Sequence, residues 1–239
     1  MRLVVARLGL NSVAPFKPGE KIIEYIVAEP PEAPLADMRL RDFVAAVAAR
    51  SAAPGGGSVS AALAALGTGL GAMAAKLTFG VRKFEHLDAR MREIIPPLHE
   101  ASLALIPMVD ADSSAFNGYM EGVGMPRDTD SEKAARQAKM QAGLKTAIRV
   151  PLETMALGDR AWDAMCAVAE VGNIACRSDI QVGARALEAG IWGAYQNVLI
   201  NMGGIRDEAF KKDTLAQAEE MAGRAREMCA RVLEILEKR

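Results

Sequence analysis

PGGGSVSAALAALGTGLGAMAAKL, residues 54–77, is the stretch that decides the fold. Its Pro-Gly-Gly-Gly turn ends one helix, and Ser58 is expected to cap the next, which runs to about Leu77. Glycine in a helix interior costs up to about 1 kcal/mol relative to alanine, so tertiary packing must hold this helix. Residues 58–75 carry no charge. Ala, Gly and Ser gain little on leaving water, however, so a buried helix of a soluble protein is favoured over a membrane span.

The chain from Asp37 onward follows the helical period. Asp37 is expected to cap a helix whose apolar positions are Leu40, Phe43, Val44 and Val47. A further helix is expected from about residue 87 to 120. It should be kinked or broken at its prolines, which are Pro96, Pro97 and Pro107.

Capping signals place the remaining helices. The boxes at 129–132 and 178–181 predict two helix starts, and Pro151 and Gly158 should interrupt the region between them. Gly203-Gly204 should end the second of these helices, and a last one should begin near residue 207. The predicted class is all-α, a bundle of long antiparallel helices.

Residues 1–37 differ in amino-acid composition from the rest of the chain. Five prolines and the short β-like runs at 3–5 and 22–27 exclude a long helix. We expect a short irregular or strand-like segment and a linker, followed by a helical domain over residues 38–239.

Composition limits the partners and the compartment. The formal net charge of −1 gives no electrostatic reason to expect nucleic acid or an acidic membrane. Three widely spaced cysteines without a CxxC pair indicate a reducing, cytoplasmic setting. His86 and His99 lie thirteen positions apart, so they do not form a helical metal pair, and we expect no metal site.

Asp112 is the strongest candidate for chemistry. It lies on an apolar helical stripe, where burial would raise its pKa toward that of a useful general base or acid. Asp110, two positions away, is rotated by roughly 200° and cannot share a proton with it. The alternative is that Asp112 pairs with a basic side chain on the helix face.

The turn Gly55-Gly56-Gly57-Ser58 is a candidate binding element. Amides at a helix N-terminus attract anions or carbonyl oxygens, and glycines let a ligand touch the backbone. No GK[ST] follows, so the turn is not a nucleotide-binding P-loop. A tight interhelical turn is the alternative.

Four polar positions later in the chain have both a binding and a structural interpretation. Asn197 and Asn201, at i and i+4, either contact a heteroaromatic ring or bond to neighbouring helices. Gly172-Asn173 and Asp179 bracket a turn before the same helix, and the helix dipole alone accounts for Asp179.

Five segments in order resemble the cyclodeaminase domain of the formimidoyltransferase-cyclodeaminase family, from about Arg39 to the C-terminus. They are 51–59 (SAAPGGGSV), 77–80 (LTFG), 109–116 (VDADSSAF), 172–182 (GNIACRSDIQV) and 193–201 (GAYQNVLIN). Residues 6–25 resemble the very end of the transferase domain, so residues 1–37 are interpreted as a transferase remnant plus linker. The resemblance places the transferase's catalytic histidine in a part absent from this chain, so no transferase activity is expected.

The resemblance implies conversion of 5-formimino-tetrahydrofolate to 5,10-methenyl-tetrahydrofolate with release of ammonia, in histidine degradation. It makes Asp112 the proton acceptor and a tetrahydrofolate derivative the substrate, with no prosthetic group. The substrate-binding candidates are Gly55, Gly56, Gly57, Ser58, Asn173, Asp179 and Asn197. It also implies at least a homodimer and allows a separate formimidoyltransferase partner.

Two rival functions stay open from the sequence. Methenyl-tetrahydrofolate cyclohydrolases occur on the same fold and share the glycine turn and the aspartate, although residues 175–181 look more like the cyclodeaminase branch. The other rival is a non-catalytic helical module that docks to a separate transferase.

Overall fold

The computed structural model describes residues 34–51 and 53–239, and all helices described here belong to the unit Leu35–Arg239. The predicted strand-like runs and the remnant at 1–37 lie almost wholly outside these residues. No strand occurs in the described part, so the all-α prediction is confirmed. The helices are α4 (Leu40–Val47), α5 (Gly56–Lys76), α6 (Asp88–Val123), α7 (Asp130–Asp159), α8 (Trp162–Val171), α9 (Arg177–Met202) and α10 (Glu208–Glu237), with 3-10 turns at Arg82–Leu87 and Ile174–Cys176.

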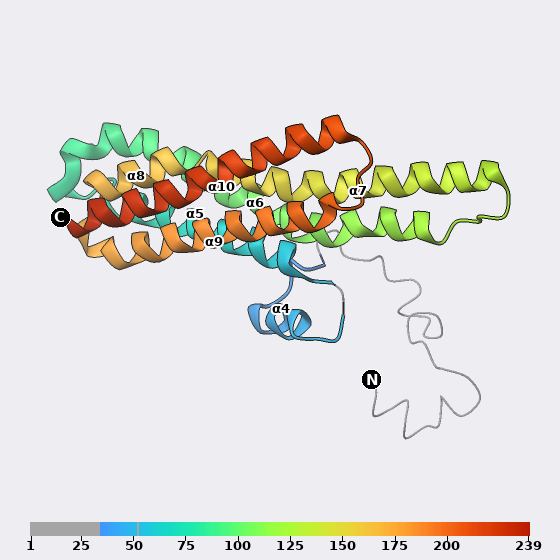
Figure 1. Cartoon of the computed structure of the whole chain (residues 1–239). Coiled ribbons are helices and arrows are strands. Elements are labelled where there is room, and N and C mark those ends of the chain that lie inside the picture. The colour runs from blue at the N-terminus through green and yellow to red at the C-terminus, as the bar shows by residue number, and fades with distance from the viewer. Residues whose placement is uncertain (1–33, 52) are drawn as a thin grey trace, which may run out of the picture. The chain divides into compact units, whose positions relative to one another are not determined.

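Long helices run back and forth along one axis, and short α4 lies beside them (Figure 1). Helix α5 packs mainly on α6 and α9, and α7 packs on α6. The largest fully buried side chains include Trp162, Met91 and Leu98. Burial of these apolar groups is the main force that holds the helices together.

Glycines allow α5 and α9 to approach closely. A Cβ on Gly67 would lie 2.5 Å from the backbone nitrogen of Leu187, and one on Gly190 would lie 2.6 Å from that of Ala64. The small-residue stripe predicted for α5 therefore packs backbone against backbone. This packing compensates for the low helix propensity of the glycines. Helix α5 is long and apolar enough to cross a membrane, but half of its most apolar window is buried against other helices.

Several helix ends follow the sequence signals. Thr129 Oγ1 accepts from the Glu132 amide and Glu132 Oε2 accepts from the Thr129 amide, which confirms that capping box. Asp207 caps α10 by accepting from the Phe210 amide. Helix α9 ends at Met202, directly before the two glycines.

Other predicted boundaries are wrong. Helix α4 begins at Leu40 without a side-chain cap from Asp37, and α9 begins at Arg177 without one from Ser178. Ser58 does not cap α5, which begins two residues earlier at Gly56; the amide and hydroxyl of Ser58 bond to α6 instead.

The prolines do not break the helices that contain them. Helix α6 continues through Pro96, Pro97 and Pro107, and α7 continues through Pro151 to end just after Gly158. A proline inside a helix costs about 3 kcal/mol or more. The buried stripes of both helices offset that cost through tertiary contacts.

Candidate functional site

Asp112 on α6 faces the first turn of α5. Its Oδ2 accepts a hydrogen bond of 3.0 Å from the amide of Ser58, the third residue of that helix. The first amides of a helix have no partner within it and form its positive end. A half-buried carboxylate therefore satisfies a free amide of α5, and the favourable field of the helix holds it in place.

Gly57 makes this approach possible. A Cβ at this position would overlap the Asp112 carboxylate, and its three nearest neighbours would all be atoms of that group. No other residue type leaves the carboxylate where it lies. The glycine predicted to contact a ligand thus contacts the candidate catalytic group.

Two serines fix the turn of α6 that carries Asp112. The fully buried Ser58 donates from Oγ to the carbonyl of Val109 at 2.7 Å. Because that hydrogen is engaged, Ser113, whose Oγ lies 3.1 Å away, donates to Ser58. Ser58, predicted to bind substrate, is directed away from the pocket and instead joins α5 to α6.

The environment of Asp112 suits proton transfer. Burial raises the pKa of its carboxyl, and hydrogen bonding from Ser58 opposes that rise. An acid shifted toward neutral pH both accepts and returns protons efficiently. Asp110 instead accepts from the amides of Leu35 and Ala36, at 2.8 and 3.1 Å, so the two acids have separate partners and do not share a proton, as predicted.

A pocket of about 590 Å³ opens beside Asp112. It brings together four of the predicted residues, Gly55, Gly56, Asp112 and Asn197. The remaining lining residues are Ser51, Ala53, Ser113, Phe116, Asn117, Met120, Ala147, Ile200 and Asn201. Phe116, Asn117 and Met120 were not predicted as site residues, although they follow Asp112 and Ser113 at helical spacing on one face of α6.

Asn173 and Asp179 do not lie at this pocket. Asn173 caps the short turn after α8 by accepting from the Ala175 amide at 3.0 Å. Asp179 lies in the first turn of α9, eighteen residues before Asn197, which corresponds to about 27 Å along the helix axis. Within this chain the two residues belong to the opposite end of α9.

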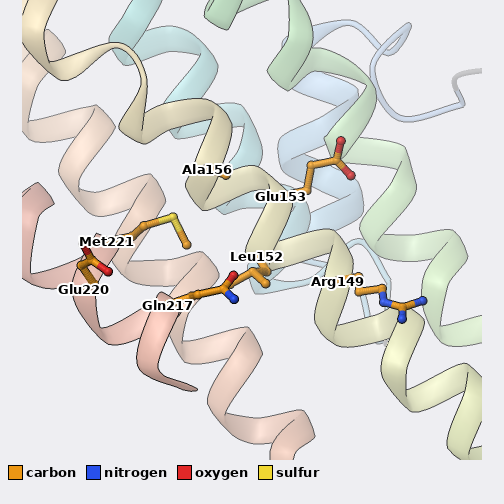
Figure 2. Close-up of a pocket in the computed structure, with 7 residues that line it drawn as sticks. All are labelled: Arg149, Leu152, Glu153, Ala156, Gln217, Glu220 and Met221. Carbon is orange, nitrogen blue, oxygen red and sulfur yellow. The ribbon is translucent and has the colours of Figure 1, made fainter. Parts of the chain in front are cut away.

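A second hollow, of about 370 Å³, lies between α7 and α10 (Figure 2). Arg149 and Glu153 line it from α7, and Glu220 lines it from α10. Both carboxylates are exposed, so this hollow offers no counterpart to the half-buried acid of the Asp112 pocket. No cluster of metal-binding side chains occurs in the described ranges 34–51 and 53–239.

Comparison with known proteins gives a consistent set of relatives. The family profile described as "Formiminotransferase-cyclodeaminase" matches residues 39–220. Formimidoyltransferase-cyclodeaminases from Sus scrofa and Gallus gallus are 50% and 48% identical to the whole chain. The chain spans only 44% of the length of each of these relatives.

Two further relatives match over most of their own length. A methenyltetrahydrofolate cyclohydrolase from Methylorubrum extorquens is 32% identical over 84% of this chain and 96% of its own. The crystal structure of a formiminotetrahydrofolate cyclodeaminase from Thermotoga maritima superposes with a TM-score of 0.75 and 28% identity. That match covers 84% of this chain and 97% of the other.

Proposed function

Because this chain belongs to the formiminotransferase-cyclodeaminase family, we propose that its Asp112 pocket converts 5-formimino-tetrahydrofolate to 5,10-methenyl-tetrahydrofolate and ammonia. The observation that carries the proposal is a half-buried carboxylate, held by the Ser58 amide, at the wall of a pocket of about 590 Å³. The identity of 50% to a formimidoyltransferase-cyclodeaminase supports the cyclodeaminase activity over that of the 32% identical cyclohydrolase.

The chemistry needs one group that moves protons. N10 of the folate attacks the formimino carbon on N5 and forms a five-membered ring. The formimino group reacts in its protonated form (N5–CH=NH2+), so attack by N10 leaves an NH2 group on the carbon. Asp112 takes the proton from N10 and gives it to this NH2 group, which leaves as ammonia. A carboxyl whose pKa is raised by burial serves both steps near neutral pH.

The tetrahydrofolate derivative is the substrate in this proposal, and no prosthetic group takes part. Gly55 and Gly56 offer backbone contacts in the pocket, and Asn197 offers a side-chain amide next to Gly56. Gly57 and Ser58 position Asp112. Asn173 and Asp179 are not part of the proposed binding site, because Asn173 precedes α9 and Asp179 lies in its first turn, at the opposite end from Asn197.

We also propose that the protein acts in the cytoplasm, in histidine degradation, as at least a homodimer. Helix α4 buries none of its residues within the described chain, and Leu40 and Val44 are 76% and 58% exposed. Apolar surface of this kind favours association with another subunit. A separate formimidoyltransferase would supply the substrate, and sedimentation of the purified protein tests the homodimer.

A paired assay of wild type and Asp112→Asn tests the activity. We expect methenyl-tetrahydrofolate and ammonia to appear together from 5-formimino-tetrahydrofolate in the wild type. The variant, which cannot accept the N10 proton, should be slower by about 10²–10⁴-fold. Consumption of supplied methenyl-tetrahydrofolate without any cyclodeaminase activity would instead establish the cyclohydrolase. A folded protein inert in both assays would favour the docking module.

A further inference from the structure

Two asparagines on α9 line the Asp112 pocket one helical turn apart. Asn197 Nδ2 donates to the carbonyl of Gly193 at 2.8 Å, and Asn201 Nδ2 donates to the carbonyl of Asn197 at 2.9 Å. Asn201 Nδ2 also lies 3.4 Å from the carbonyl of Ala147 on α7. Each amide therefore has its nitrogen turned toward backbone acceptors, and this fixes which end of the group is the oxygen.

The two side-chain oxygens are left available. Neither Oδ1 accepts a hydrogen bond from the described part of the chain, and neither is among the buried polar atoms without a partner. An asparagine oxygen is an acceptor with two lone pairs. The two asparagine oxygens on α9 and the Asp112 carboxylate on α6 are therefore acceptors in the lining of one pocket.

The rest of the pocket suits a flat ring. Phe116 and Ile200, which are 43% and 80% exposed, supply apolar surface beside the amides. Flat heteroaromatic rings with adjacent N–H donors match such a combination of apolar surface and convergent acceptors.

We propose that Asn197 and Asn201 bind the aminopyrimidine edge of the pteridine, each Oδ1 accepting from an N–H donor of that edge. The inference rests on the proposed function for its ligand, and it makes the asparagines substrate-orienting residues. They fix the ring so that the reacting atoms face Asp112. A ligand that lacks these donors leaves an acceptor unpaired, so the pair also determines specificity.

Binding of 5-formyl-tetrahydrofolate and its 2-desamino analogue to wild type, Asn197→Ala and Asn201→Ala tests the inference by calorimetry. Each variant should bind 5-formyl-tetrahydrofolate roughly 2- to 13-fold more weakly, the loss expected for one neutral hydrogen bond. Removing the 2-amino group should weaken binding to the wild type similarly. In the variant that lacks the asparagine oxygen bonded to the 2-amino group, removing that amino group should weaken binding little further. Gln196→Ala, an exposed neighbour on α9, should change neither affinity.

The outcomes separate this inference from the proposed function. If both asparagine variants stay as sensitive as wild type to the loss of the 2-amino group, the inference is overturned. It is also overturned if wild type does not bind 5-formyl-tetrahydrofolate. Wild type that binds with the expected pattern but does not turn over 5-formimino-tetrahydrofolate would refute the reaction and leave the binding mode standing.

Discussion

Substitution of Gly57 by alanine is the sharpest perturbation of the site. The added methyl group would overlap the Asp112 carboxylate and no other group is as close. Because Gly57 belongs to a helix, its backbone is compatible with alanine, so the substitution acts by displacing the carboxylate.

The magnitude follows from what the displacement breaks. The hydrogen bond of 3.0 Å from the Ser58 amide to a carboxylate contributes about 1.5–3 kcal/mol. Alanine in place of glycine returns about 1 kcal/mol of helix propensity, so the fold should survive. A catalytic group misplaced by about 1 Å costs on the order of 100-fold in rate. We therefore expect kcat/KM to fall by about two orders of magnitude with a modest change in Tm.

The assay is methenyl-tetrahydrofolate formation from 5-formimino-tetrahydrofolate, with thermal unfolding measured on the same samples. Gly69→Ala is the matched control, because it lies on the same helix and a Cβ there meets nothing within 4 Å. It should keep wild-type kinetics. In an Asp112→Ala background, Gly57→Ala should no longer destabilise the fold. Near-normal kcat/KM in Gly57→Ala would refute the steric argument.

Three further predictions follow from the same structure. Burial raises the Asp112 pKa, so kcat/KM should decline on acidification with a midpoint above the ordinary value of about 3.9. Because the Asp112 pKa is higher in the folded state than in the unfolded state, wild type loses stability as the pH rises through the folded-state value. Asparagine stays neutral, so Asp112→Asn should be more stable than wild type at pH 7 but not below about pH 4. Gly67→Ala should cost about 1–3 kcal/mol, since its Cβ would lie 2.6 Å from the carbonyl of Gly183. Its Tm should fall by roughly 2–4 °C per kcal/mol, and a Tm equal to that of Gly69→Ala would contradict close α5–α9 contact.

Asp112 could be chosen from the sequence because an acid on an apolar stripe is costly to bury charged, and only a polar partner makes its position tenable. Which residue provides that partner could not be predicted from the sequence. Ser58 looked like a helix cap, and its amide and hydroxyl are used on α6 instead. A local sequence pattern cannot show whether a serine caps its own helix or bonds to a residue far away in sequence, because both arrangements use the same hydrogen-bonding groups of the serine.

Sequence patterns alone are enough to predict the helical class, the capping box at Thr129 and the end of α9, because these depend on residues within one or two turns of each other. Tertiary structure decided the rest. It carried helices through Pro107 and Pro151, whose local cost is offset by distant packing. It also brought Asn197 and Asp112 to one pocket and left Asp179 about 27 Å from Asn197 along α9. The packing of helices against each other, and not the spacing of residues in the sequence, sets which side chains share a pocket.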